Sequence, residues 1–304
     1  MSFSLEVKQE LSRFETKNTC CVKTECYGSW LFTKCFSPLE SAFISESGEA
    51  VRKMADMIAQ ICGVIPEVNF LMSRRKKTSY RLTLPDSKDR EKMIRAFGHS
   101  PNEVTLQINN SNFPDSCCCS SFLRGAFLSC GIISDPSRGY HMEFTNLHRT
   151  LAEDLCLFIR KLDGFSIRSQ VGVRKGNHYV YIKESEQCEE LLTYIGASHA
   201  AMKLMQVKMY KEVKNNINRR SNCETANMDK TYSASAKQIA AIARIVDAGL
   251  LEELPENQKK LAEMRLENPE MSLRDLALVL GDTRSGVNYR IKKIMDIAEK
   301  IECV

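Results

Sequence analysis

The chain has 304 residues, of which 43% are hydrophobic and 27% charged, as in an ordinary globular protein with ample material for a core. It contains no run of 18 or more apolar residues, so we expect no membrane span. The N-terminal sequence MSFSLEVKQELSRFE predicts a charged amphipathic helix and not a secretion signal, which favours a cytoplasmic location. The net charge of +5 is too small to identify a partner.

Thirteen cysteines are many for such a chain, and they raise the question of a metal site. The clusters are Cys20-Cys21 and Cys117-Cys118-Cys119. Neighbouring side chains are expected to diverge, and no C-x2-C pair is matched by a second pair or by a histidine. The sequence therefore favours reduced structural thiols and predicts no metal and no other cofactor, while a redox role for the cysteines stays open.

An internal repeat organises the first two thirds of the chain, with half-repeats at about 20–98 and 117–196. A displacement of 97 residues aligns Cys20 with Cys117 and Gly28 with Gly125. Each half predicts a motif helix, strands, an amphipathic helix, a hairpin and a short helix that ends at glycine. Because the two glycines permit close backbone approach, we predict an α+β domain over residues 1–200, with one saddle-shaped antiparallel sheet and helices on one face.

The sequence FLRGAFLSCG (122–131) resembles the motif helix of LAGLIDADG homing endonucleases, and residues 26–34 form a weaker copy. Over nearly its full length the chain is similar to the WhiA family of bacterial transcription regulators. The matching stretches are SFSLEVKQEL, CCVKTE, FLRGAFLSCGIISDPSRGYHMEF, YIGAS, NRRSNCETANMDK and SLRDLALVLGDTRSGVNYRIKK. This resemblance implies a degenerate LAGLIDADG-like domain followed by a helix-turn-helix domain, and a role in cell division, chromosome segregation or sporulation.

The motif helices lack the acids that nuclease chemistry requires. In active endonucleases, by the same resemblance, the eighth motif position of each helix supplies a carboxylate for a divalent metal. Those positions are Thr33 and Cys130 here, and a hydroxyl and a soft thiol do not replace two carboxylates. Glu25 lies elsewhere on its helix, and Asp135 has no acidic equivalent in the first half. We therefore predict no catalytic residues and no enzyme activity, with a residual endonuclease as the alternative. For Cys130, a packed small residue is favoured over a redox-sensing thiol.

Both predicted hairpins have basic tips that are able to contact phosphates. The residues are Arg74, Arg75, Lys76 and Lys77 in the first half, and Arg168, Arg174 and Lys175 in the second. Whether this surface contacts DNA or a protein partner is open from sequence.

The last third of the chain predicts helices. Residues 201–232 predict a helical or polar linker, since their Asn-rich part suits a linker or an irregular helix end. Residues 233–304 predict a helix-turn-helix domain with helices at 234–248, 256–268, 273–280 and 284–300. Ser272 and Asp275 form a capping box before the third of these, and Gly281 supplies the turn before the fourth.

The exposed side of this pair of helices predicts contacts with double-stranded DNA. Arg284 suits bidentate contact with guanine, and Asn288 suits contact with adenine. The candidate DNA-binding residues are Ser272, Arg274, Thr283, Arg284, Ser285, Asn288, Tyr289, Arg290, Lys292 and Lys293. Residues 231–304 hold eleven Lys and Arg against twelve acids, which favours specific binding over nonspecific coating. The alternatives are a helical hairpin with a solvated basic face, and a scaffold that acts through a partner regulator. The DNA sequence, the direction of regulation and the oligomeric state are open.

Overall fold

The structure is a computed structural model that describes residues 2–72 and 78–301. Its internal contacts divide the chain into two compact units, Met1–Lys211 and Glu212–Val304. The first unit contains helices and two antiparallel sheets, and the second is helical. None of the described helices combines the length and the apolar character that crossing a membrane requires.

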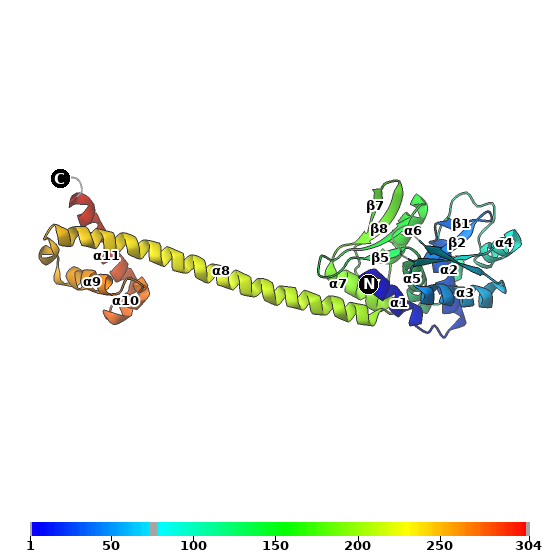
Figure 1. Ribbon diagram of the computed structural model, residues 1–304, viewed down its shortest axis with the longest axis horizontal. Coiled ribbons are helices and arrows are strands. Elements are labelled where there is room, and N and C mark those ends of the chain that lie inside the picture. Colours follow the sequence, from blue (N-terminus) through cyan, green and yellow to red (C-terminus); the bar gives the residue numbers. More distant parts are fainter. Residues whose placement is uncertain (1, 73–77, 302–304) are drawn as a thin grey trace. The chain divides into compact units, whose positions relative to one another are not determined.

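The first unit repeats one order of elements twice, as predicted from the internal repeat (Figure 1). An N-terminal helix, α1 (Phe3–Arg13), precedes both halves. The first half consists of α2 (Thr19–Leu31), β1 (Cys35–Phe36), β2 (Ser41–Ser45), α3 (Gly48–Cys62), β3 (Glu67–Met72), β4 (Thr78–Thr83) and α4 (Ser87–Ala96). The second half consists of α5 (Cys117–Cys130), β5 (Gly131–Ile133), β6 (Met142–Asn146), α6 (Arg149–Arg160), β7 (Gln170–Arg174), β8 (Asn177–Ile182) and α7 (Ser185–Ile195). A short 3-10 turn, η1 (Asn110–Asn112), lies between them.

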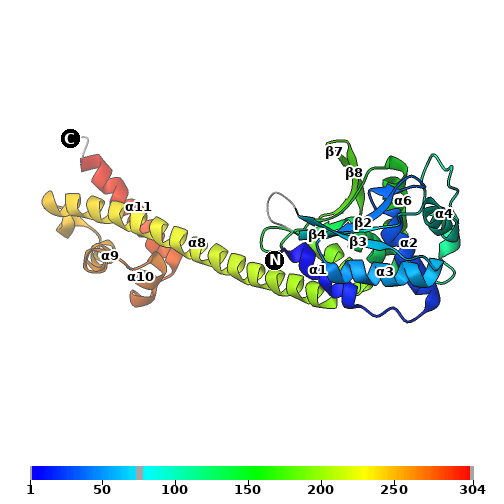
Figure 2. The ribbon, with the colours of Figure 1, turned by 45° about the vertical axis from the view of Figure 1, so that its right-hand side comes forward.

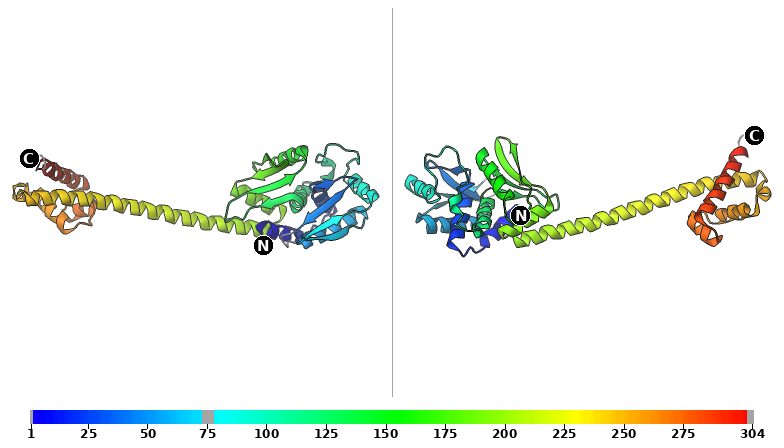
Figure 3. Two further views of the ribbon diagram at one scale, coloured as in Figure 1. Left: turned by 45° about the horizontal axis from the view of Figure 1, so that its top comes forward. Right: turned by 180° about the vertical axis from the view of Figure 1, so that it is seen from behind.

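The strands form two four-stranded sheets, so the expectation of one continuous sheet is wrong. Their orders are β1-β2-β4-β3 and β5-β6-β8-β7, and all pairs are antiparallel. Figure 3 shows the two sheets as separate groups of strands, the first in blue and the second in green. Within the described residues, no strand of one half pairs with a strand of the other. The halves are therefore joined by packing of helices and not by hydrogen bonds between sheets.

The contact between α2 and α5 brings two backbones together at the aligned glycines. A Cβ atom on Gly28 would lie 2.3 Å from the carbonyl oxygen of Phe122, and one on Gly125 would lie 2.0 Å from that of Glu25. Both separations are far shorter than any real Cβ contact. The Ser29 hydroxyl donates a hydrogen bond to the Gly125 carbonyl at 3.1 Å, across the same contact. The predicted role of the glycines is confirmed.

A buried charge cluster lies beside this contact. The carboxylate of Glu25, which is fully buried, pairs with Lys53 Nζ at 2.6 Å and lies 3.6 Å from Arg124 Nε. The Thr16 hydroxyl donates to the same carboxylate at 2.5 Å, and the Arg124 guanidinium lies 3.8 Å from the centre of the Phe14 ring. Burial lowers the pKa of both Lys53 and Arg124, while the nearby Glu25 carboxylate opposes that shift. Glu25 is therefore a structural residue that links α2 to α3 and α5.

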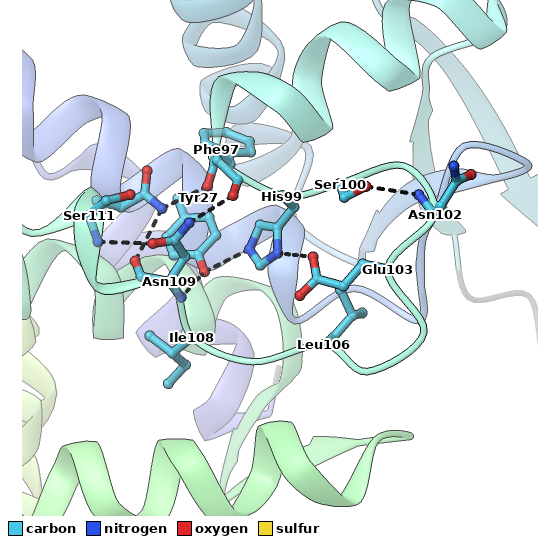
Figure 4. Close-up of polar contacts among 12 residues, drawn as sticks. Tyr27, Phe97, His99, Ser100, Asn102, Glu103, Leu106, Ile108, Asn109 and Ser111 are labelled. Atoms are coloured by element: carbon cyan, nitrogen blue, oxygen red, sulfur yellow. Dashed lines mark hydrogen bonds and ion pairs between the residues drawn. The ribbon is translucent and has the colours of Figure 1, made fainter.

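The segment that joins the two halves is fixed to α2 by a polar network (Figure 4). The Tyr27 hydroxyl accepts a hydrogen bond from the Asn109 backbone N–H at 2.8 Å and lies 3.0 Å from His99 Nε2. The other ring nitrogen of His99 lies 2.7 Å from a carboxylate oxygen of Glu103. Burial raises the pKa of Tyr27, so its hydroxyl stays protonated. Helix α1 packs beside α3 (Figure 2), and most residues of α2 are buried in the first unit.

One helix, α8 (Ser198–Asp247), runs from the first unit into the second for 50 residues. The irregular helix end expected in its Asn-rich part is therefore wrong, as is the separate helix expected at 234–248. Residues 214–230 contain no glycine or proline, and asparagine costs a helix only up to about 0.7 kcal/mol relative to alanine. An ion pair between Arg220 and Glu224, one turn apart, also stabilises the helix.

The second unit continues with η2 (Leu251–Glu253), α9 (Glu256–Glu267), α10 (Leu273–Val279) and α11 (Arg284–Ile301). Its core consists of Ala241, Ile242, Ile245, Leu254, Leu261, Ala262, Leu276, Ala277, Val287, Ile291, Ile294 and Ala298. The Arg265 side chain is also buried in this unit, and its guanidinium donates a hydrogen bond to the Met271 carbonyl at 2.5 Å. Ser235 of α8 donates to the Pro269 carbonyl at 2.5 Å, so the turn between α9 and α10 is attached to α8.

We predict that Gly125→Ala lowers the free energy of unfolding by about 1–3 kcal/mol or more, because the added methyl group overlaps the Glu25 carbonyl and the helices have to separate. Urea unfolding followed by the fluorescence of Trp30, the single tryptophan and a buried residue of α2, measures the change. The matched control is Gly139→Ala, since nothing lies within 4 Å of a Cβ atom there. Equal stability of the two variants would contradict the prediction.

Glu25→Gln should lower the free energy of unfolding by about 3–5 kcal/mol, because two buried cations then lose their counter-charge. The same fluorescence assay applies. The control is Glu49→Gln, whose ion pair with Arg13 is exposed and contributes about 0–1 kcal/mol. A loss no larger than in the control would show that Glu25 does not stabilise the helix contact.

Candidate nucleic-acid interface and the degenerate motif helices

The two eighth motif positions line one cleft of about 910 Å³ in the first unit. Thr33 lies two residues beyond the end of α2, and its hydroxyl is within hydrogen-bonding distance of the carbonyls of Trp30 (2.8 Å) and Cys35 (2.9 Å). Cys130 is the last residue of α5, and burial raises the pKa of its thiol to about 12. Thr33 therefore stabilises a turn, and Cys130 is a protonated, packed thiol.

Helix α1 supplies a cation, Lys8, to the same cleft, and no sequence pattern predicted it. The Ser4 hydroxyl donates to the Ile133 carbonyl at 2.6 Å and accepts from the Ile133 N–H at 2.8 Å, so α1 is fixed to β5. Lys8 lines the cleft, and burial lowers its pKa to about 8 while Cys130 and Glu46 oppose the shift. No short-range signal marks Lys8, because its neighbours lie far along the chain.

The charge of this cleft is unfavourable for a divalent cation. The basic residues that line it are Lys8, Lys34 and Arg174. Glu46 is the one acid among its described lining residues. Asp135 lies in an exposed turn, where its carboxylate accepts the Ser137 N–H at 2.8 Å. The cleft therefore lacks the paired hard ligands that magnesium requires.

Of the two basic hairpin tips, only the second lies within the described residues. Arg74, Arg75, Lys76 and Lys77 lie outside the described residues. Arg168 and Lys175 are exposed, and Lys175 adopts a φ of 52° in the two-residue turn before β8. The Arg174 guanidinium donates a hydrogen bond to a carboxylate oxygen of Glu143 at 2.7 Å and lies over the Tyr179 ring, so its positive charge is partly compensated.

The helix-turn-helix geometry of α10 and α11 follows from local signals. Ser272 and Asp275 form the predicted capping box, and Gly281 adopts a φ of 65° in the turn. The Asp282 N–H then donates to the Ala277 carbonyl at 2.9 Å, which closes the turn after α10. Leu276, Val287 and Ile291 are buried between the helices, and Leu280 packs at their edge. The predicted cap, turn and packing are confirmed.

Most of the candidate DNA-binding residues are exposed on these helices. The exposed ones are Arg274, Thr283, Arg284, Ser285, Asn288, Tyr289, Lys292 and Lys293. Three candidates have structural roles as well. Ser272 caps α10, the Thr283 hydroxyl accepts the Gly286 N–H at 3.1 Å, and Arg290 forms an ion pair with Asp282. The exposed candidates without a structural role are therefore centred on Arg284 and Asn288, which lie one turn apart at the start of α11 and are available for contact with DNA bases.

The structure also brings together four cysteines that were not predicted to form a cluster. The sulfur atoms of Cys20, Cys21, Cys117 and Cys118 all lie within 4.8 Å of one another. The expectation that vicinal side chains diverge is wrong here, because the sulfurs of Cys20 and Cys21 lie 4.0 Å apart. The signal was present in the repeat, which places one cysteine pair at the same position of each motif helix.

The fold and these two sites define a degenerate LAGLIDADG-like scaffold joined to a helix-turn-helix domain. The chain belongs to the WhiA family: residues 119–214 match the model "WhiA LAGLIDADG-like domain", and residues 217–298 match "WhiA C-terminal HTH domain". A relative from Ruminiclostridium cellulolyticum is 37% identical over 99% of this chain and 98% of its own length, and one from Thermoanaerobacter sp. is 34% identical over the same shares. Both bear the name "Probable cell division protein WhiA". A crystal structure of full-length DUF199/WhiA from Thermatoga maritima matches 99% of each chain with 25% identity and a TM-score of 0.60.

Proposed function

We propose that this protein is a sequence-specific DNA-binding transcription regulator of genes for cell division, chromosome segregation or sporulation, and that it acts at the nucleoid in the cytoplasm. The observation that carries the proposal is the exposed N-terminal half of α11, where Arg284 and Asn288 project from a capped and well-packed helix pair. The family match and the relatives named as cell division proteins support it.

The side chains of α11 are suited to contacts with base edges and phosphates in the major groove. Arg284 is able to donate two hydrogen bonds to guanine, and Asn288 is able to pair with adenine. Lys292 is exposed one turn further on and lies near the phosphate backbone when the helix start enters the groove. Because Arg290 is held by Asp282, we assign it to the turn and not to a phosphate contact.

Arg284→Ala and Asn288→Ala should each weaken binding to the cognate site by about 10- to 100-fold, since a bidentate base contact contributes about 1–3 kcal/mol. Electrophoretic mobility shifts at fixed salt, with a scrambled site for comparison, measure the specific part. The control is Lys300→Ala, which removes an exposed cation from the last turn of the same helix. Unchanged specific binding by both variants would exclude the helix-turn-helix as the site of recognition.

A second candidate function is a scaffold that acts through a partner regulator. The observation that favours it is the outer strand β3, where Phe70 is 74% and Met72 is 81% exposed, and such apolar side chains suit a protein surface better than phosphates. Chromosome-wide occupancy of an Arg284→Ala, Asn288→Ala double variant distinguishes the two. Retained occupancy at the wild-type sites favours recruitment by a partner, whereas loss favours direct recognition.

We further propose that the protein has no nuclease activity, because Thr33 and Cys130 replace the acids and Lys8 lies in the same cleft. Supercoiled plasmid incubated with magnesium or manganese should stay uncut. The double variant Thr33→Asp, Cys130→Asp supplies the two acids, and the further change Lys8→Ala removes the cation from the cleft. Comparison of the two variants shows whether the missing acids or the Lys8 charge prevents metal-dependent cutting. Metal-dependent cutting by the wild-type protein would overturn the proposal.

A further inference from the structure

The four clustered cysteines lie in the first turns of the two motif helices, at the ends opposite to Thr33 and Cys130. Cys20 and Cys21 belong to α2, and Cys117 and Cys118 belong to α5. The Cys21 thiol donates to the Cys117 sulfur at 3.3 Å, across the contact between the two halves. Cys21 and Cys118 are buried, Cys20 is half-buried and Cys117 is exposed. The cluster is thus largely closed and has one side open to solvent.

The spacing of the sulfurs fits one tetrahedral metal ion. Zn–S bonds of about 2.3 Å place the four sulfurs of a tetrathiolate site about 3.8 Å apart. All pairs in this cluster lie within 4.8 Å; the sulfurs of Cys20 and Cys21 are 4.0 Å apart and those of Cys21 and Cys117 are 3.3 Å apart, on either side of 3.8 Å. Iron–sulfur clusters separate their cysteine ligands by several bridged metal atoms, so such a compact set favours a single ion.

The helix termini around the cluster favour a bound cation with thiolate ligands. All four cysteines lie in the first turn of α2 or α5, at the positive end of a helix dipole, which favours thiolates. Neither helix has a side-chain cap at its N-terminus that would compensate this positive end. Four thiolates repel one another unless a cation lies between them, and a divalent ion removes that repulsion.

We propose that Cys20, Cys21, Cys117 and Cys118 bind one Zn²⁺ ion that fastens the two halves of the LAGLIDADG-like domain. Two ligands come from each half, at positions related by the internal repeat. The ion connects residues 96 positions apart in the chain, between Cys21 and Cys117. Because a preformed site of this kind is absent from the unfolded chain, metal binding contributes directly to folding.

The experiment uses the full-length chain, purified under reducing conditions from cells supplied with zinc, and elemental analysis of all transition metals. We expect about one zinc ion per chain, as in a structural site with four cysteine ligands. The test variant is Cys20→Ser with Cys117→Ser, which alters the more exposed member of each pair and so perturbs packing least. The matched control is Cys119→Ser, the next residue of α5 and outside the cluster. Circular dichroism confirms that each variant is folded.

Two further readouts separate ligation from packing. Cobalt(II) added to the metal-free protein should give the sulfur-to-metal charge-transfer and intense visible bands of a tetrahedral thiolate site, and the double variant should lose them. Removal of metal by a chelator should lower the midpoint of thermal unfolding in the wild-type and Cys119→Ser proteins and leave the double variant unchanged.

Three outcomes would overturn the proposal. They are purified protein without stoichiometric metal, equal metal content in the double variant and the wild type, and a Cys21–Cys117 disulfide in protein whose thiols are blocked at the moment of lysis. The last would show that the cluster serves thiol oxidation instead.

Discussion

The close backbone contact between α2 and α5 is the constraint on which the first unit depends. Because no described strand of one sheet pairs with a strand of the other, the position of one half against the other is set by how near these helices approach. Gly28 and Gly125 leave no room for a side chain there. The same contact places both helix ends in one cleft and both helix starts around one group of sulfurs. The LAGLIDADG-like helix pair thus presents different side chains at its two ends, Thr33 and Cys130 at one and four cysteines at the other.

Much of the fold could be predicted from sequence because its signals are local. The periodic runs gave α3 and α6, glycines ended several helices, and the Ser272–Asp275 capping box marked the start of α10. The internal repeat predicted which elements correspond, although β1 and β5 are too short to leave a pattern. The length of α8 was missed because an Asn-rich composition was given more weight than the absence of glycine and proline.

The sites were predictable only where neighbours in sequence are also neighbours in space. The turn before α11 and the exposure of Arg284 and Asn288 follow from a short segment. The ion pair that occupies Arg290 depends on the geometry of the turn, and Lys8 enters the cleft through long-range packing of α1. The convergence of Cys21 with Cys117 likewise requires the packed helix pair. Local patterns do not contain such information.

The buried charge cluster makes the two halves chemically unequal. Glu25 of α2 faces Arg124 of α5, whereas the positions equivalent to them by the repeat are Phe122 and Tyr27. In two copies of the first half paired through α2, each Glu25 would keep Lys53 but lose the Arg124 guanidinium, and in two copies of the second half each Arg124 would lose its carboxylate. Each half is therefore complementary to the other and not to itself. The two halves share one order of elements, but in this charge cluster one half supplies the carboxylate and the other the guanidinium, so they are not interchangeable.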